Sequence, residues 1–334
     1  MPQGFLMHIP DNYLSPSTCA VMGVAMVPVW SRCIKKIKNE LSFKNIPSIS
    51  LMSAFSFLIM MFNVPLPGGT TGHAVGAALI ALLIGPYAAC ISISVALMVQ
   101  ALLFGDGGII AFGANAFNMA FVMPFAAYYS YIVLRSIFSE KKSWKQISVF
   151  IAAYISIAVG ALMASIEFGI QPLLFKDAAG LPLYSPYPLS IAIPEMMIPH
   201  LLVVGLIEAF ITVGVYSYIE KVSPSSIYEL SYSRYKPIYI VLVLLIILCP
   251  LGLLATGTAW GEWGVHEIRN MLGFVPGGML KGFSFNAVMP DYNIPAIASK
   301  TVAYVVSAIT GVVIIMAAFG IFILFKRTIT KKGS

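Results

Sequence analysis

Residues 147–165 read ISVFIAAYISIAVGALMAS, a run of 19 residues without a charged side chain. An α-helix needs about 20 mostly apolar residues to cross the hydrocarbon core of a bilayer. Inside that core the backbone finds no water, so a spanning segment must satisfy its own N–H and C=O groups, as a helix does. The run is therefore predicted to be a transmembrane helix.

Eight further apolar runs share this character, although a turn-forming stretch, NVPLPGG at residues 63–69, separates the second run from a short third one. The nine predicted spans cover roughly residues 14–31, 47–63, 72–85, 87–104, 114–134, 147–165, 195–219, 237–255 and 301–325. The predicted fold class is an all-α integral membrane protein with about nine transmembrane helices.

The composition of the whole chain supports this class. Of its 334 residues, 59% are hydrophobic and 10% are charged, whereas soluble domains carry about 25% charged residues. The net charge of +7 could suggest a nucleic-acid partner. The basic residues, however, lie in short clusters between the apolar runs, which is typical of cytoplasmic loops in membrane proteins.

These clusters also predict the topology. Sixteen of the 20 Lys and Arg residues lie after the first, fifth and seventh spans and in the C-terminal tail. With nine spans, all four segments fall on one side, and the positive-inside rule makes that side the cytoplasm. The N-terminus is then outside and the C-terminus inside, in a plasma membrane that we expect to be prokaryotic.

A polar junction at residues 220–236 divides the chain. We predict a seven-span core at residues 1–230 and a two-span appendage at residues 231–334. The appendage contains an external loop at residues 256–300 that is rich in Gly, Trp, Pro and Asn.

The chemistry is expected to centre on histidine, of which the chain has only four. If the functional chain begins at Met7, His8 is its second residue. The free amine of Met7, the amide nitrogen of His8 and its Nδ1 can then chelate one metal ion. The amide must lose its proton, which favours metals that accept a square plane of nitrogens, such as Ni²⁺ and Cu²⁺. Alternatively, His8 is an ordinary histidine at the membrane interface.

The chain as written cannot form this chelate, because Pro2 has no amide N–H. Residues 1–6 would have to be absent or removed, and Met7 is itself a possible initiator. His73 follows the glycine-rich turn at residues 67–72 and is a plausible fourth donor. Alternatively, it is a hydrogen-bonded histidine that caps a helix.

Five ordered motifs resemble the nickel/cobalt substrate-binding membrane components of energy-coupling-factor transporters, the NikM/CbiM type. The motifs are MHIPDNYLS at 7–15, PGGTTGH at 67–73, QALLFGDGG at 100–108, GANAFNMA at 113–120 and HLLVVGLIEA at 200–209. Asn12 stands where the family commonly has Gly, and Asn tolerates a left-handed backbone.

The resemblance implies seven core helices and an N-terminus that inserts into the fold, with Met7, His8 and His73 as metal ligands. It also implies partner subunits, namely a transmembrane coupling protein and ATP-hydrolysing subunits. The stretch ATGTAWGEWG at residues 255–264 looks like a fused NikN-type module, although it lacks an Asp-Gly-Leu-Glu signature. No cofactor is expected, because Ni²⁺ or Co²⁺ is the transported substrate.

An all-nitrogen plane favours Ni²⁺ over tetrahedral Zn²⁺, and GGTTGH at residues 68–73 replaces the Ser-Cys-Ser-His of cobalt-type relatives. Asn115, Asn118, Gln100 and His200 are candidates for supporting the ligands. For these residues, hydrogen bonding between helices is the alternative. Glu208 is an intramembrane acid whose role stays open, and Asp106 and Asp11 are interpreted as turn and cap residues.

The two rival functions are an autonomous channel or secondary carrier and an intramembrane metal enzyme. An autonomous channel or secondary carrier needs a polar pathway, yet the spans contain few ionisable groups. A metal enzyme needs a general base and an open metal position, and a closed plane of four nitrogens offers neither. No Gly-x4-Gly-Lys-[Ser/Thr] phosphate loop occurs in the chain, so energy for transport is expected from a partner.

Overall fold

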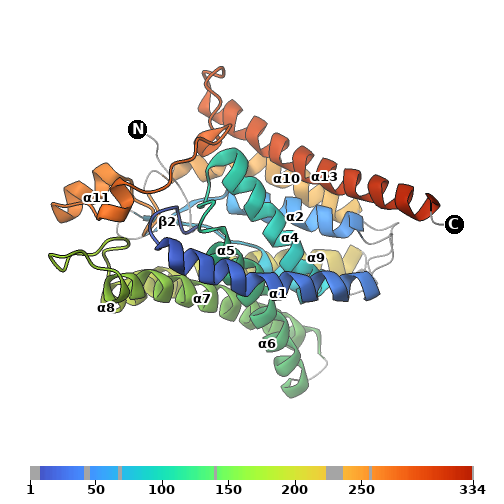
Figure 1. Ribbon diagram of the computed structural model, residues 1–334. Helices are drawn as coiled ribbons and strands as arrows, with labels where there is room; N and C mark the ends of the chain where they lie inside the picture. Colours follow the sequence, from blue (N-terminus) through green and yellow to red (C-terminus); the bar gives the residue numbers. More distant parts are fainter. Residues whose placement is uncertain are drawn as a thin grey trace.

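The computed structural model describes residues 8–40, 46–66, 70–138, 141–222, 236–255 and 258–332 (Figure 1). Met7, the expected amine donor, lies outside the described residues, as does most of the polar junction at residues 220–236.

Long apolar helices make up most of the described chain, which confirms the all-α membrane class. Seven of them are long and apolar enough to cross a bilayer. They are α1 (Pro16–Glu40), α4 (Pro86–Val99) with η2 (Gln100–Phe104), α5 (Phe112–Asn115) with η3 (Ala116–Val122) and α6 (Met123–Ile137), α7 (Lys142–Leu174), α8 (Leu189–Pro199) with η4 (His200–Val204) and α9 (Gly205–Val222), α10 (Lys236–Leu248) with η7 (Cys249–Leu254), and α13 (Lys300–Lys332).

The second and third predicted spans are shorter than expected. They correspond to α2 (Ile46–Met60) and α3 (Ala77–Ile84), with 15 and 8 residues. Fourteen of the 15 residues of α2 are buried, as befits a helix that is apolar on every face. It packs against α4, α13 and α10. These two helices therefore build the interior of the fold.

A two-stranded hairpin lies between α2 and α3, where the sequence predicted only an interruption. Strand β1 (Val64–Leu66) pairs antiparallel with β2 (Thr70–Gly72), and Val64 lies opposite Gly72. The pairing satisfies backbone groups that would otherwise be buried without partners. The hairpin lies at one end of the molecule, here called the hairpin end, and delivers the chain to His73.

Three of the long helices contain a π-turn, namely η2, η3 and η4. A π-turn holds one residue more per turn than an α-helix and occurs frequently at functional sites. Gln100 begins η2, Asn118 lies within η3 and His200 begins η4. All three are buried polar residues within predominantly apolar helices.

The outward faces of the helices are apolar. On α1 the exposed side chains include Val21, Val24 and Val27, and α10 exposes Val243 and Ile247. Such surfaces are stable against lipid tails. The C-terminal ends of α1, α9 and α13 lie toward the end of the molecule opposite the hairpin (Figure 1).

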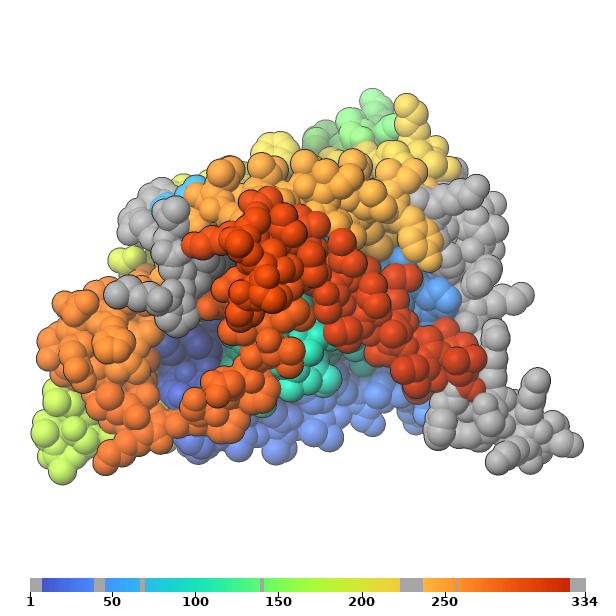
Figure 2. All heavy atoms as spheres, turned by 90° about the horizontal axis from the view of Figure 1, so that it is seen from above, coloured from blue at the N-terminus to red at the C-terminus, as the bar shows by residue number. Residues whose placement is uncertain are grey.

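The segment at residues 258–299, between η7 and α13, contains α11 (Val265–Leu272), α12 (Gly277–Leu280) and η8 (Pro290–Tyr292). It lies over the hairpin end, and the start of the described chain is visible between its parts in the view from above (Figure 2). The segment and residues 10–12 line a cavity of about 390 Å³ with the 101–109 region.

Candidate metal centre

His8 and His73 come together inside the hairpin end. Their ring centroids lie 5.2 Å apart and the rings are inclined by 33°. The two side chains are 2% and 1% exposed. His8 comes from the N-terminal segment, residues 8–15, and His73 from the turn between β2 and α3, residues 73–76. The fold thus brings two imidazoles from distant parts of the chain within reach of one ion.

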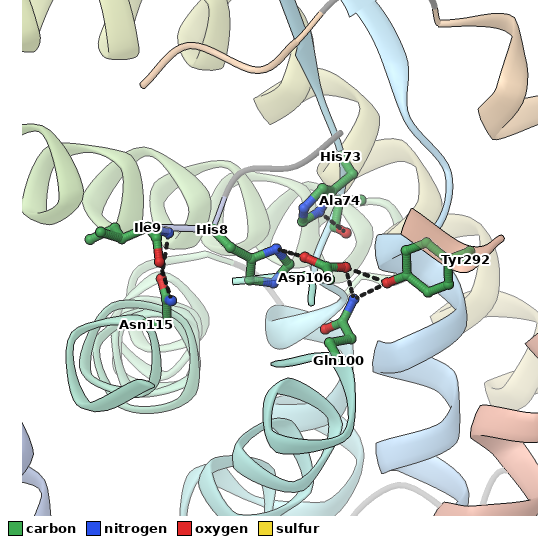
Figure 3. A network of polar contacts seen from close by, with 8 residues as sticks. All are labelled: His8, Ile9, His73, Ala74, Gln100, Asp106, Asn115 and Tyr292. Atoms are coloured by element: carbon green, nitrogen blue, oxygen red, sulfur yellow. Dashed lines mark hydrogen bonds and ion pairs between the residues drawn. The ribbon is translucent and has the colours of Figure 1, made fainter. Parts of the chain in front are cut away.

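Asn115 holds the N-terminal segment next to His8. Its Oδ1 accepts the Ile9 amide at 2.8 Å, and its Nδ2 donates to the Ile9 carbonyl at 2.9 Å (Figure 3). The Gly108 amide donates to the same carbonyl at 3.0 Å. Both backbone polar atoms of Ile9, the residue after His8, are therefore held.

Asp11 fixes the segment a second time. Its carboxylate accepts the amides of Ile109, Ile110 and Ala111, which precede α5, at 2.9, 2.8 and 3.2 Å. A Cβ at Gly108 would lie 2.3 Å from Asp11 Oδ1, so only glycine allows this approach. The cap that the sequence predicted for Asp11 acts on a helix about 100 residues away.

Asn12 and Tyr13 tie the segment to residues 258–299. Asn12 has a φ of +72°, and its amide exchanges two hydrogen bonds of 2.8 Å with the backbone of Phe283. Tyr13 donates through its hydroxyl to the Trp263 carbonyl at 2.7 Å. Asn at position 12 thus combines a left-handed backbone with a specific contact, which the family's glycine could not make.

Asp106 contacts His8 directly. Its Oδ1 lies 2.6 Å from His8 Nδ1 (Figure 3). Its Oδ2 accepts from Gln100 Nε2 at 2.8 Å and from the Tyr292 hydroxyl. Burial and the neighbouring Asp106 raise the pKa of Tyr292 far above its usual value, so the phenol stays protonated and donates.

Glu262, a partly buried residue of the 258–299 segment, reaches the backbone of His8. Burial and the Asp106 carboxylate raise its pKa well above the usual value, and a hydrogen bond with the His8 backbone opposes that rise. Glu262 and Tyr292 both follow α10. The C-terminal part of the chain therefore reaches the backbone of one histidine and the carboxylate that holds its ring.

His73 is held by its own turn. Its Nδ1 lies 3.0 Å from the Ala74 carbonyl, and a carbonyl can only accept, so the proton is assigned to Nδ1 and the lone pair to Nε2. By the same reasoning the Asp106 contact places a proton on His8 Nδ1. His8 Nε2 is buried and has no hydrogen-bond partner within the described ranges.

The other predicted supporting residues have hydrogen-bond partners of their own. Gln100 acts on Asp106 and Tyr292 rather than on a histidine. Asn118 donates to Glu167 on α7 at 2.9 Å. His200 Nδ1 lies 2.6 Å from the Met196 carbonyl of its own helix. Of the four, Asn115 is the residue that contacts the N-terminal segment.

The sequence did not identify three residues at this centre. Asp106 was interpreted as a turn residue, although its place among Gly105, Gly107 and Gly108 marked a tight polar turn. Glu262 stands among tryptophans in the predicted external loop, and no pattern singled out Tyr292. In the described part of the chain, no group of three or more His, Cys, Asp or Glu side chains is arranged to hold a metal ion.

The fold and this centre define a helical membrane protein with a buried pair of histidines at one end. A model of the cobalt uptake substrate-specific transmembrane region, CbiM, matches residues 8–226, and a model of the PDGLE domain matches residues 235–327. The chain belongs to the CbiM family and carries a PDGLE, NikN-like domain after it.

Curated relatives match nearly the whole chain. It is 46% identical over 319 residues to the probable fused nickel transport protein LarMN of Lactiplantibacillus plantarum, covering 93% of this chain and 95% of the relative. It is 42% identical over 335 residues to the fused nickel transport protein NikMN of Rhodobacter capsulatus, covering 94% and 96%. A crystal structure of a transition metal transporter matches with a TM-score of 0.61 and 54% identity, over 65% of this chain and 93% of that one.

Proposed function

We propose that this protein is the substrate-binding component of an ATP-driven energy-coupling-factor importer, and that it captures Ni²⁺, or Co²⁺, at an external site. The observation that carries the proposal is the pair of buried imidazoles 5.2 Å apart, one of them on an N-terminal segment inserted into the fold. The names of the fused relatives, which are nickel transport proteins, favour nickel as the substrate.

Four nitrogens would bind the ion: the Met7 amine, the His8 amide, His8 Nδ1 and His73 Nε2. The amine, the amide and Nδ1 belong to adjacent residues and close two chelate rings, so they impose a plane that suits Ni²⁺. His8 Nδ1 faces Asp106 Oδ1 at 2.6 Å. The ion and this carboxylate compete for the same nitrogen, so loading requires the Asp106 contact to open.

A second geometry uses only ring nitrogens. Histidines that bind metals commonly donate their other N–H to a carboxylate or a carbonyl, as His8 does to Asp106 and His73 to Ala74. Nε2 of both rings would then bind the ion without the N-terminal amine. The two geometries differ in their need for a chain that begins at Met7.

The chain is proposed to depend on partners for energy. It contains no phosphate-loop motif, and CbiM is by description a substrate-specific region. A transmembrane coupling subunit and ATP-hydrolysing subunits would drive release to the cytoplasm. The protein would lie in a prokaryotic plasma membrane with the hairpin end outside and the basic ends of α1, α9 and α13 inside.

The two-span appendage is proposed to act at the site together with the seven-span core. We place the boundary between them near residue 230. Glu262 and Tyr292 come from the appendage and reach the His8 backbone and Asp106. The metal centre would then be shared between the two domains.

The deciding experiment compares two starting points of the chain. The N-terminus of the expressed protein is identified by mass spectrometry, and Ni²⁺ is titrated into purified protein that begins at Met7 or at Met1. Tight binding and the absorption of a square-planar complex are expected only for the Met7 start. Equal binding by both proteins would contradict the chelate and favour the second geometry, in which Nε2 of both rings binds the ion.

A second measurement addresses transport. The purified chain in liposomes, without ATPase partners, is expected to show no Ni²⁺ uptake. Uptake under these conditions would favour an autonomous channel or carrier. Uptake that appears only with the coupling and ATPase subunits and ATP would support the importer.

A further inference from the structure

Glu208 lies on α9 with its side chain 1% exposed. Its Oε2 accepts the Val75 amide at 2.9 Å and the Gly76 amide at 3.1 Å. These two N–H groups belong to the turn that carries His73 and directly precede α3. An acid from one helix thus holds the entry to another helix, 132 residues away in the sequence.

The start of α3 needs such a partner. The first N–H groups of a helix have no acceptor inside the helix. At this position they are buried within the fold, where an unsatisfied amide costs about 1–3 kcal/mol. Gly76, the N-cap residue of α3, has no side chain that could serve. A carboxylate there also interacts favourably with the positive end of the helix dipole.

The opposite side of the turn is held by α2. Ser56 donates through its hydroxyl to the Val75 carbonyl at 3.0 Å. Gly76 has a φ of +72°, and a Cβ on it would lie 2.5 Å from the Phe55 ring. Both polar atoms of Val75 are therefore engaged, its amide by α9 and its carbonyl by α2, and the turn cannot shift without losing these contacts.

The consequence falls on His73. The carbonyl that accepts from His73 Nδ1 belongs to Ala74, the residue before Val75. Ala74 carries this carbonyl in the same peptide group as the Val75 amide, which Glu208 holds. The orientation of that one peptide plane fixes both the tautomer and the direction of the imidazole.

We propose that Glu208 is a positioning residue for the metal site, which holds the Ala74–Val75 peptide so that His73 Nε2 points at the ion. The inference rests on the proposed function. It assigns a role to Glu208, which is not among the proposed metal ligands. Glu208 acts as a hydrogen-bond acceptor, and its charge is dispensable.

The test is a double-mutant cycle in the full chain beginning at Met7, with Ni²⁺ affinity and absorption spectrum as readouts. Glu208→Leu removes the acceptor and is expected to weaken binding at least about tenfold, as loss of a residue that orients a metal ligand does. In a His73→Ala background the same change is expected to add less than about twofold, because both act through one imidazole.

Glu208→Gln separates the role of this side chain as a hydrogen-bond acceptor from the role of its negative charge. It keeps a carbonyl oxygen for the two amides, so its Ni²⁺ affinity is expected to stay within about threefold of the unmodified chain. Glu220→Gln is the matched control, because Glu220 lies on the same helix and pairs with Lys145 at 2.5 Å. It is expected to leave Ni²⁺ affinity unchanged.

The inference would be overturned by full affinity in Glu208→Leu, by additive losses in the cycle, or by a Gln variant as weak as the Leu variant. If Glu208→Leu does not fold, Ser56→Ala replaces it in the cycle, since it frees the carbonyl of the next peptide, Val75–Gly76, and so loosens the same turn from the other side. A smaller loss of about threefold is then expected, again absent in the His73→Ala background. Failure of the unmodified chain to bind Ni²⁺ would refute the proposed function instead.

Discussion

The N-terminal segment and the His73 turn present the two histidines in different ways. The turn is held inside the core, by Glu208 from α9 and Ser56 from α2. The N-terminal segment is held by groups from distant parts of the chain, which include Asn115, Asp106 and Glu262. One imidazole is thus a fixed part of the fold, while the other is on a segment that must be assembled.

The difference indicates which side moves when an ion binds. Chain termini are ordered only where they are tied down, and the ring of His8 is tied by a side-chain contact with Asp106 that can be exchanged. The Asp106 contact uses the nitrogen that the chelate needs. We infer that the ion is captured by rearrangement of the His8 side around a stationary His73.

Among the tests of this comparison, His8→Ala in the chain beginning at Met7 is expected to have the largest effect. It removes one ring donor and the second chelate ring together. Ni²⁺ affinity, measured by calorimetric titration, is expected to fall on the order of 100-fold or more, above the typical effect of a supporting residue. A fall smaller than that of His73→Ala would invert the comparison.

His73→Ala is expected to have the second largest effect, a loss of about 10- to 100-fold in Ni²⁺ affinity. It removes one donor from the fixed side, and water can take the open position. The absorption spectrum should change while the Met7 requirement persists. Unchanged affinity would show that the fourth donor comes from elsewhere.

Asn115→Ala tests the ties of the N-terminal segment. Both hydrogen bonds to Ile9 are lost, so we expect about a tenfold weaker Ni²⁺ affinity and a stability loss of about 1–3 kcal/mol in thermal unfolding. Asn118→Ala provides the comparison, and its effect on affinity should be smaller because Asn118 donates to Glu167. Equal effects would mean that both asparagines orient the site.

Tyr292→Phe is the smallest expected change. The phenol donates to Asp106 and so weakens its hold on His8 Nδ1. Its loss should make Asp106 a stronger competitor of the ion and lower Ni²⁺ affinity about threefold. The ring stack with Phe104, at a centroid distance of 4.5 Å, is retained. Tyr304→Phe is the control, since Tyr304 donates to the Met61 carbonyl, and a loss of equal size there would exclude a specific route through Asp106.

The sequence predicts the fold class well because hydrophobic length is a local property. Runs such as residues 147–165 need no partner to be recognised as spans. It overestimates the lengths of α2 and α3, because a buried helix and a spanning helix are equally apolar. The β1–β2 hairpin was missed, since Pro65 and the glycines signalled only a turn.

The centre was predicted less completely than the fold. The place of His8 directly after Met7 and the glycine-rich turn before His73 singled out these two histidines, which the structure brings together. Asp106, Glu262 and Tyr292 could not be found in this way, because their roles depend on contacts between residues about 100 to 250 positions apart. Such contacts leave no trace in local spacing, and Met7 as a ligand stays a prediction.

The π-turns make the polar groups near the centre sensitive to the length of the chain. An α-helix turns by about 100° per residue. Each π-turn takes up one extra residue locally, so deleting one residue from η2 or η4 would restore regular winding there and leave the flanking turns, with Asp106 or Glu208 beyond them, facing as before. Only the residues inside the turn, Gln100 or His200 among them, would be redirected. Among relatives, a single-residue gap at Gln100–Phe104 or His200–Val204 should therefore coincide with replacement of Gln100 or His200, while the acid that follows is kept.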